Sequence, residues 1–238
     1  MFAPDALFVL IAASVPCVTG HYVFSRFLFN NTMTEQWEYY MPFYDIYSPD
    51  VRCGRGASTS GPGSKTATVL AGDEVGFVIG RSADEPMEPY IIYHNGPGQA
   101  YLSRSNSYDL SSYEGDGEWF KIASLGAKND TWWLTRDQTG MNFTIPPTTP
   151  PGKYLLRVEH LYVRPAFNTT QFYIACAQIE VLGNDGGGAR MPGPEFMAKF
   201  PGAYDFSDPG ILVEERVYDW PSSGLLEYKA PGPPVWTG

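Results

Sequence analysis

Residues 150–181 read PPGKYLLRVEHLYVRPAFNTTQFYIACAQIEV and contain the clearest fold signal in the chain. Two runs of apolar, β-branched and aromatic residues, 153–160 and 171–181, are separated by a polar segment. Such runs between turn-forming residues are typical of β-strands. The same pattern predicts further strands at residues 21–29, 67–69, 74–79, 90–94, 100–103, 132–135 and 141–145. Many short strands joined by Gly- and Pro-rich turns predict an all-β sandwich or barrel.

The composition agrees with a β-rich globular domain. The 238 residues include 25 Gly and 21 Pro, which disfavour long helices, while 43% are apolar, enough for a hydrophobic core. The formal net charge of −10 argues against a nucleic-acid partner and against binding to an anionic membrane. Zincin HExxH and hydrolase GxSxG motifs are missing from the sequence. A carboxylate pair for glycoside hydrolysis stays possible, although no spacing singles one out.

The first twenty residues, MFAPDALFVLIAASVPCVTG, are predicted to be a signal peptide. The apolar run from Leu7 to Val18 has the length of a signal-peptide core and is too short for a membrane span. Val18 and Gly20 place small residues at positions −3 and −1 of a cut before His21. We therefore expect a secreted, extracellular protein that begins at His21. The alternative is that this segment forms a buried N-terminal strand.

The remaining cysteines and the glycosylation sequons agree with secretion. Removal of the leader takes away Cys17 and leaves Cys53 and Cys176, which predict one disulfide in an oxidising compartment. We also expect glycosylation at the N-x-Ser/Thr sequons that begin at Asn30, Asn129, Asn142 and Asn168. The secreted domain is expected to span residues 21–211. Residues 212–238 predict an extended or disordered tail, because they end in PGPPVWTG.

His21 becomes chemically distinctive once it is the first residue. It then offers an α-amino nitrogen, whose ordinary pKa is about 7.7–8, together with an imidazole nitrogen. The imidazole of His94 would complete a three-nitrogen set, which favours Cu(II), and a tyrosine could serve as a weak axial ligand. The alternative for His94 is an ordinary loop histidine.

The chain resembles the lytic polysaccharide monooxygenases of auxiliary activity family nine, formerly classed as glycoside hydrolases. The resemblance follows the family order through the segments HYVFSRFLFNN (21–31), SPDVRC (48–53), LAGDEVGFVI (70–79), HNGPGQAYLSR (94–104), GDGEWFKI (115–122), PPGKYLLRVEHL (150–161), QFYIACAQIEV (171–181) and FPGAYDFSDPGI (200–211). It implies an immunoglobulin-like or fibronectin III-like sandwich with long loops and a flat face that bears one copper ion.

The resemblance also implies a set of site residues. His21 and His94 match the two histidine ligands of the family, and Tyr173 matches its axial tyrosine. Gln171 matches the family's outer-sphere glutamine, and residues two apart on a strand share a face with one another. Cys53 and Cys176 match the family's disulfide. Tyr204 in PGAY matches an aromatic residue that stacks on the substrate, and its alternative role is to hold its own loop in place.

One departure from the family lies beside the expected metal site. The family commonly has RHEIIALH, whose last histidine is an outer-sphere proton donor, whereas this chain has RVEHLYVR and ends on Arg164. An arginine keeps its charge near neutral pH, so it can supply a fixed positive charge and hydrogen bonds but not a transferable proton. His160, four residues earlier, is expected to have a core or surface role.

The function implied by the resemblance is oxidative cleavage of a β-1,4-linked polysaccharide, with cellulose as the expected substrate. Hydroxylation would take place at C1 or C4, with O2 or H2O2 as co-substrate and an external electron donor. The protein is expected to act as a monomer. The alternative, motivated by Arg164, is a weakly active or non-catalytic protein that binds copper or polysaccharide.

Overall fold

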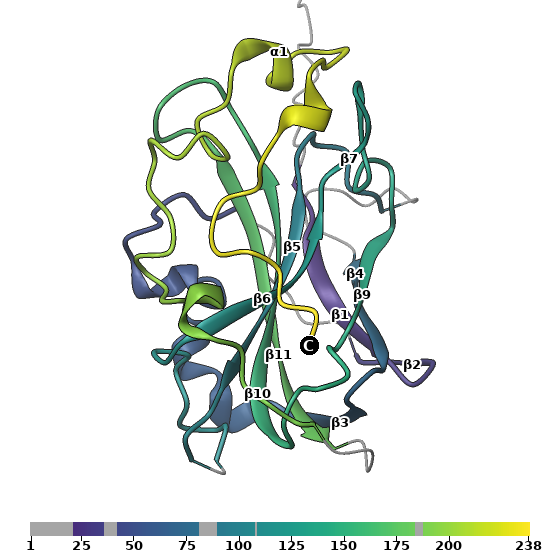
Figure 1. The fold of residues 1–238 in the computed structure, drawn as a ribbon, viewed down its shortest axis with the longest axis vertical. Coiled ribbons are helices and arrows are strands. Elements are labelled where there is room, and N and C mark those ends of the chain that lie inside the picture. Colours follow the sequence, from purple (N-terminus) through teal and green to yellow (C-terminus); the bar gives the residue numbers. More distant parts are fainter. Residues whose placement is uncertain (1–20, 36–41, 81–89, 108, 184–187) are drawn as a thin grey trace, which may run out of the picture.

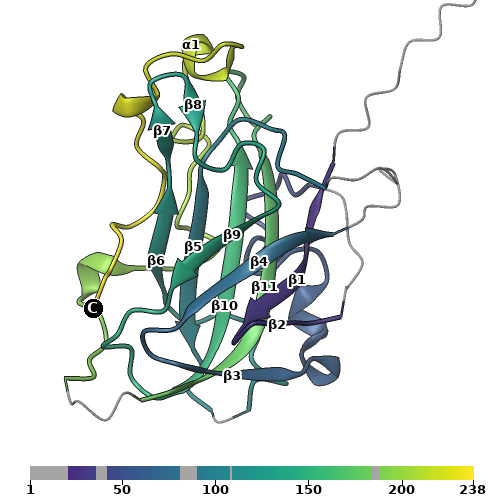
Figure 2. The ribbon, with the colours of Figure 1, turned by 90° about the vertical axis from the view of Figure 1, so that its right-hand side faces the viewer.

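The computed structural model describes residues 21–35, 42–80, 90–107, 109–183 and 188–238. Within these ranges the chain forms two main β-sheets that pack face to face, with loops and short helices around them. In Figure 2, strands β1 (Val23–Phe29) and β4 (Glu74–Gly80) cross in front of β10 (Gly152–Tyr162) and β11 (Gln171–Leu182). The predicted leader, residues 1–20, lies outside the described residues.

The smaller sheet has four strands and the larger has six. The smaller runs in the order β2 (Thr32–Met33), β1, β4 and β9 (Gly140–Thr144). The larger runs in the order β12 (Met197–Ala198), β6 (Trp119–Leu125), β5 (Gly98–Arg104), β10, β11 and β3 (Thr66–Leu70). A hairpin of β7 (Ala127–Asn129) and β8 (Trp132–Trp133) is separate, and β3 is the one strand of the large sheet that pairs in parallel.

Helices are short in the described part of the chain. The α-helix α1 spans Glu215–Tyr218, and single 3-10 turns lie at Pro49–Val51, Ala57–Thr59, Gly61–Gly63, Pro194–Phe196 and Leu225–Glu227. No helix among the described residues is long and apolar enough to cross a membrane.

The hydrophobic core lies between the two sheets. Phe24 and Phe77 from the small sheet share one buried cluster with Leu102 and Leu156 from the large sheet. Alternation along each strand directs these side chains inward, because successive residues of a strand point to opposite faces. The predicted all-β sandwich is therefore confirmed.

The predicted disulfide is present. Cys176 in β11 is bonded to Cys53, which follows the 3-10 turn at Pro49–Val51, and the two Cα atoms are 5.1 Å apart. The bond joins the loop that precedes β3 to the middle of the large sheet. Asn30, Asn129, Asn142 and Asn168, the predicted glycosylation sites, are all solvent-exposed.

Two details of the strand prediction differ from the structure. Residues 90–94 form a loop, in which Ile92 exchanges backbone hydrogen bonds with Asp137 and Gln138. Strand β6 lies where no strand was expected from pattern. Lys121 of this strand is buried, and its Nζ donates to the carbonyl of Pro231 over 2.7 Å. This hydrogen bond gives the buried ammonium group a partner, so the strand can contain a charged residue that breaks the apolar sequence pattern.

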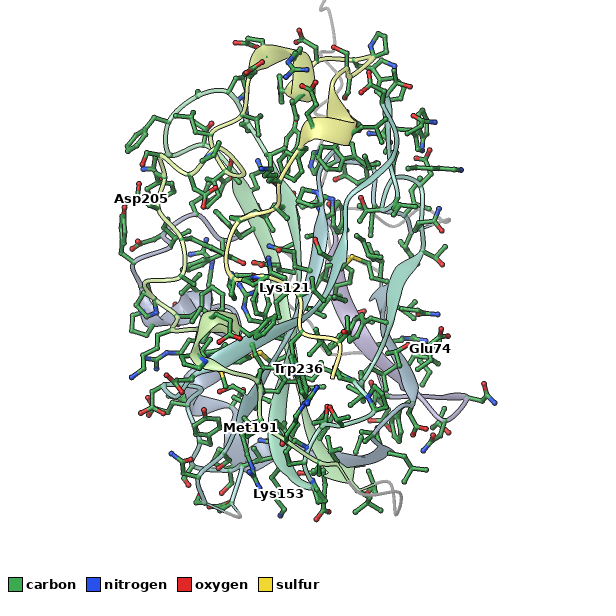
Figure 3. All side chains as sticks on the ribbon, viewed as in Figure 1. Glu74, Lys121, Lys153, Met191, Asp205 and Trp236 are labelled. Carbon is green, nitrogen blue, oxygen red and sulfur yellow. A yellow bond between two sulfur atoms is a disulfide. The ribbon has the colours of Figure 1, made fainter. Side chains whose placement is uncertain are left out.

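Residues 212–238, for which an extended or disordered tail was predicted, are ordered and pack along the sandwich. Val217, Leu225 and Trp236 are buried. Trp236 lies edge-on to Phe120, and its backbone N–H donates to the carbonyl of Lys121 over 2.8 Å. Figure 3 labels Trp236 and Lys121 near one another where the chain end crosses the large sheet. Apolar side chains spaced along a Pro-rich segment therefore hold it in place, although its regular secondary structure is limited to α1 and the 3-10 turn at Leu225–Glu227.

Candidate metal centre

His21 and His94 come from two separate segments that meet at one end of the sandwich. His21 immediately precedes Tyr22 and β1, whereas His94 lies in the loop before β5. Burial, together with the nearby charges of Arg136 and Arg164, lowers the pKa of His94 to about 3. The ring centroid of Tyr22, the residue after His21, lies 5.8 Å from that of His94, so the chain at His21 lies close to the His94 loop. His94 is neutral at ordinary pH and can offer a lone pair to a metal.

Gln171 and Tyr173 lie together at the start of β11. Both side chains are buried, and the Tyr173 hydroxyl donates to Oε1 of Gln171 over 2.7 Å. The ring centroids of Tyr173 and His94 are 5.8 Å apart. Burial raises the pKa of Tyr173, so its phenol stays protonated at neutral pH. The structure thus brings the predicted axial tyrosine, the glutamine and His94 into one neighbourhood.

Tyr22 is a site residue that the sequence reasoning missed. Its ring stacks on Tyr173 with centroids 4.2 Å apart, and its hydroxyl is 2.6 Å from Nδ1 of His160. His160 is fully buried and pairs with Tyr173 across β10 and β11, in agreement with the core role expected for it. The signal available in the sequence was the position of Tyr22, directly after the expected first ligand.

A second aromatic group covers His94 from the other side. The ring of Tyr162, at the end of β10, stacks on the His94 imidazole with centroids 4.0 Å apart and an interplanar angle of 8°. The guanidinium carbon of Arg164 lies 5.6 Å from the ring centroids of both Tyr162 and Tyr218. Arg164 therefore lies beside both tyrosine rings, and its charge contributes to the lowered pKa of His94.

Arg136 connects the His94 loop to an exposed tryptophan. Its Nη1 donates to the carbonyl of Tyr93 and to Oδ1 of Asn95, the residues on either side of His94. Its guanidinium carbon lies 5.2 Å from the ring centroid of Trp220, whose residue is 59% exposed. Trp132 contacts the same indole edge-on at 5.1 Å.

The substrate-stacking role predicted for Tyr204 does not fit the structure, because the side chain is only 4% exposed. Its hydroxyl donates to Glu159 and is 2.7 Å from the hydroxyl of Tyr101. Glu159 in turn accepts from Arg157 over 2.7 Å in a buried ion pair. Tyr204 therefore holds its loop on the large sheet, which was the alternative considered for it.

The available donors fit a nitrogen-bound copper ion. The described residues contain no cluster of three His, Cys, Asp or Glu side chains that could hold a metal. Two imidazoles and a tyrosine are present, so the third nitrogen would be the α-amino group released by a cut before His21. A set rich in neutral nitrogen suits Cu(II) better than the oxygen-preferring Mg²⁺ or Ca²⁺.

Comparisons with known proteins agree with the site. The sequence model of Auxiliary Activity family 9 (formerly GH61) matches residues 19–224. The AA9 family lytic polysaccharide monooxygenase U of Thermothielavioides terrestris is 38% identical, covering 95% of this chain and 96% of that protein. The AA9 family lytic polysaccharide monooxygenase C of Emericella nidulans is also 38% identical, covering 92% and 93%.

Solved structures show the same fold. The crystal structure of HiLPMO9B superposes with a TM-score of 0.75 at 26% identity, covering 92% of this chain and all of that one. A cellulose-active polysaccharide monooxygenase from M. thermophila superposes with a TM-score of 0.73, also at 26% identity and with the same coverage.

Proposed function

Because the chain belongs to auxiliary activity family 9, the lytic polysaccharide monooxygenases, we propose that it is secreted, begins at His21 and cleaves cellulose oxidatively at C1 or C4. The family supports copper as the cofactor and oxidative polysaccharide cleavage as the reaction. The cellulose-active relative from M. thermophila supports the choice of substrate. The observation that carries the proposal is that Tyr22, the residue after His21, and Tyr173 both lie with ring centroids 5.8 Å from that of His94.

His21 and His94 would hold the metal. The proposed ligands are the α-amino and imidazole nitrogens of His21 and the imidazole of His94, and the Tyr173 hydroxyl would be a further, weaker ligand. Bound copper would supply the one-electron redox chemistry with O2 or H2O2 that the protein side chains lack. His94 is held neutral by burial, so it needs no deprotonation before it binds.

Gln171 and Tyr173 would order the metal's surroundings. Tyr173 donates to Oε1 of Gln171, so the glutamine can offer its Nε2 donor to an oxygen co-substrate. The protonated phenol of Tyr173 would be a weak ligand, so the nitrogen donors of His21 and His94 would hold the metal. Both side chains are buried, so their positions are set before a substrate arrives.

Arg164 favours one alternative, a copper- or polysaccharide-binding protein with little catalytic activity. The guanidinium carries its positive charge beside the rings of Tyr162 and Tyr218 and can stabilise a nearby negative oxygen by charge and hydrogen bonding. It cannot deliver a proton at neutral pH. The relative rates of the wild-type enzyme and Arg164→His therefore report how much the reaction needs a transferable proton at this position.

Trp220 is the exposed aromatic that we propose for substrate contact in place of Tyr204. Arg136 and Trp132 hold its indole, and more than half of the residue is open to solvent. The apolar C–H faces of glucose units pack well on such a ring. Trp220 is two residues from Tyr218, which contacts the Tyr162 ring that stacks on His94.

The test uses the secreted protein, with mass spectrometry to establish that it begins at His21. Copper-loaded protein, reductant and cellulose should release oxidised oligosaccharides, and removal of copper or of both O2 and H2O2 should abolish them. Unoxidised sugars that form despite copper chelation would instead identify a hydrolase. If Arg164→His and wild type both bind copper and neither releases oxidised products, the binding-only alternative is correct.

A further inference from the structure

The C-terminal segment approaches the proposed metal centre through backbone contacts. The carbonyl of Ile211 accepts from the Thr170 hydroxyl over 2.8 Å, and Leu212 bridges to Arg164. The N–H of Val213 donates to the carbonyl of Arg164 over 3.3 Å. These contacts place α1 next to the end of β10, at the opposite end of the molecule from β3 (Figure 1).

From there the segment contacts the surroundings of His94 at two independent points. The hydroxyl of Tyr162 donates to that of Tyr218 over 3.3 Å, and their ring centroids are 5.8 Å apart. Farther along, the Ser222 hydroxyl accepts from Nδ2 of Asn95 over 3.4 Å. One contact therefore supports the ring that covers His94, and the other bonds to the residue that follows His94.

His94 has particular need of such support, because residues 90–94 lie in a loop rather than in a strand. A loop histidine would lose rotamer freedom when it binds a metal, and that loss weakens binding. The nearly parallel stack of Tyr162 removes this freedom in advance. Tyr162 is itself half-buried, and Tyr218 contacts it through both its hydroxyl and its ring.

We infer that residues 211–222 are a functional part of the metal centre, in which Tyr218 holds Tyr162 against His94 and thereby fixes the plane of the His94 imidazole for copper. Tyr162 and Tyr218 are positioning residues that act through His94. This inference rests on the proposed function, because it takes His94 to be a copper ligand.

The test compares Tyr162→Leu and Tyr218→Leu with Tyr162→Phe, which keeps the stacked ring and removes only the hydroxyl. Copper(II) affinity of the mature protein is measured by titration against a competing chelator, and the geometry of the metal by electron paramagnetic resonance. We expect Tyr162→Leu to weaken copper binding about 2- to 10-fold, the value of an aromatic pair, and to change the copper hyperfine splitting. Tyr162→Phe should retain most of the affinity and the wild-type spectrum.

Tyr113→Leu is the matched control. Tyr113 is also half-buried, and its hydroxyl lies 2.6 Å from that of Ser103, a residue of β5. This variant should lower the melting temperature of the metal-free protein without changing copper affinity or spectrum. Tyr218→Leu should weaken copper binding and change the spectrum in the same direction as Tyr162→Leu. Wild-type values for either variant would overturn the inference, and Tyr218→Leu tests it even where Tyr162→Leu fails to fold. A wild-type protein that binds no copper would contradict the proposed function as well.

Discussion

The hydroxyl of Tyr22 lies 2.6 Å from Nδ1 of His160, although the two residues are 138 positions apart in the chain. Both side chains are buried, and Tyr22 also stacks on Tyr173. This contact holds the residue next to His21 near the end of the β10–β11 pair at which Tyr162 pairs with Gln171. The position of the N-terminal end, and with it the proposed ligand His21, therefore depends on a hydrogen bond inside the core.

Tyr22→Phe should destabilise the metal-free protein by roughly 1–3 kcal/mol, because it leaves a buried imidazole nitrogen without its partner. Denaturant unfolding measures the change. The double variant Tyr22→Phe/His160→Phe should lose less unfolding free energy than the two single variants lose in sum, because both substitutions remove the same hydrogen bond. Strict additivity would show that the contact contributes nothing.

Acid should destabilise the metal-free protein through His160. Burial lowers the pKa of His160 to about 3, below the value of about 6.5 expected when the chain is unfolded. The unfolded state therefore binds more protons between these values, so the stability present above pH 6.5 is lost as the pH falls toward 3. As the pH falls through this range, the unfolding free energy of His160→Asn should decrease less steeply than that of the wild type. The two slopes should differ by up to about 1.4 kcal/mol per pH unit. Equal slopes would contradict the prediction.

The disulfide should contribute a large share of the stability. Cys53 and Cys176 close a loop across a sequence separation of 123 residues. In the chain-entropy model, such a loop corresponds to about 4–5 kcal/mol, with a typical measured range of about 2–5 kcal/mol. Cys53→Ala with Cys176→Ala should lower the denaturant midpoint accordingly. Wild-type protein kept in reductant serves as the control and should unfold near the same midpoint as the double variant.

Substitutions of Tyr204 and of Trp220 should have opposite effects on stability and on cellulose binding. Tyr204→Phe leaves the buried Glu159 one donor short and should cost roughly 1–3 kcal/mol of stability, with unchanged binding to cellulose. Trp220→Ala should change stability by only about 0.5 kcal/mol and weaken cellulose binding about 2- to 10-fold. Pull-down isotherms and unfolding curves measure both quantities. Weaker cellulose binding by a fully folded Tyr204→Phe would restore the original assignment of Tyr204.

The local pattern of the chain was sufficient for most of the architecture. The run QFYIACAQIEV predicted β11, and the period of two along it correctly placed Gln171 and Tyr173 on one face. The cysteine count predicted the bond between Cys53 and Cys176. These features follow from the order of neighbouring residues or from the number of cysteines, so they can be predicted from the sequence alone.

The local sequence pattern could not predict which loop residues are buried or which distant residues they contact. An aromatic residue in a Pro-Gly loop has the same local sequence whether it faces solvent or core, so the pattern could not show that Glu159 lies beneath Tyr204. The packing of residues 212–238 likewise depends on partners such as Phe120 in β6. Tyr22, Tyr162 and Tyr218 gather around the proposed copper ligands because chain closure brings distant segments together. The period of two along a strand predicts on which face of the sheet a side chain lies. The residues that it contacts on that face are determined only when the two sheets pack together.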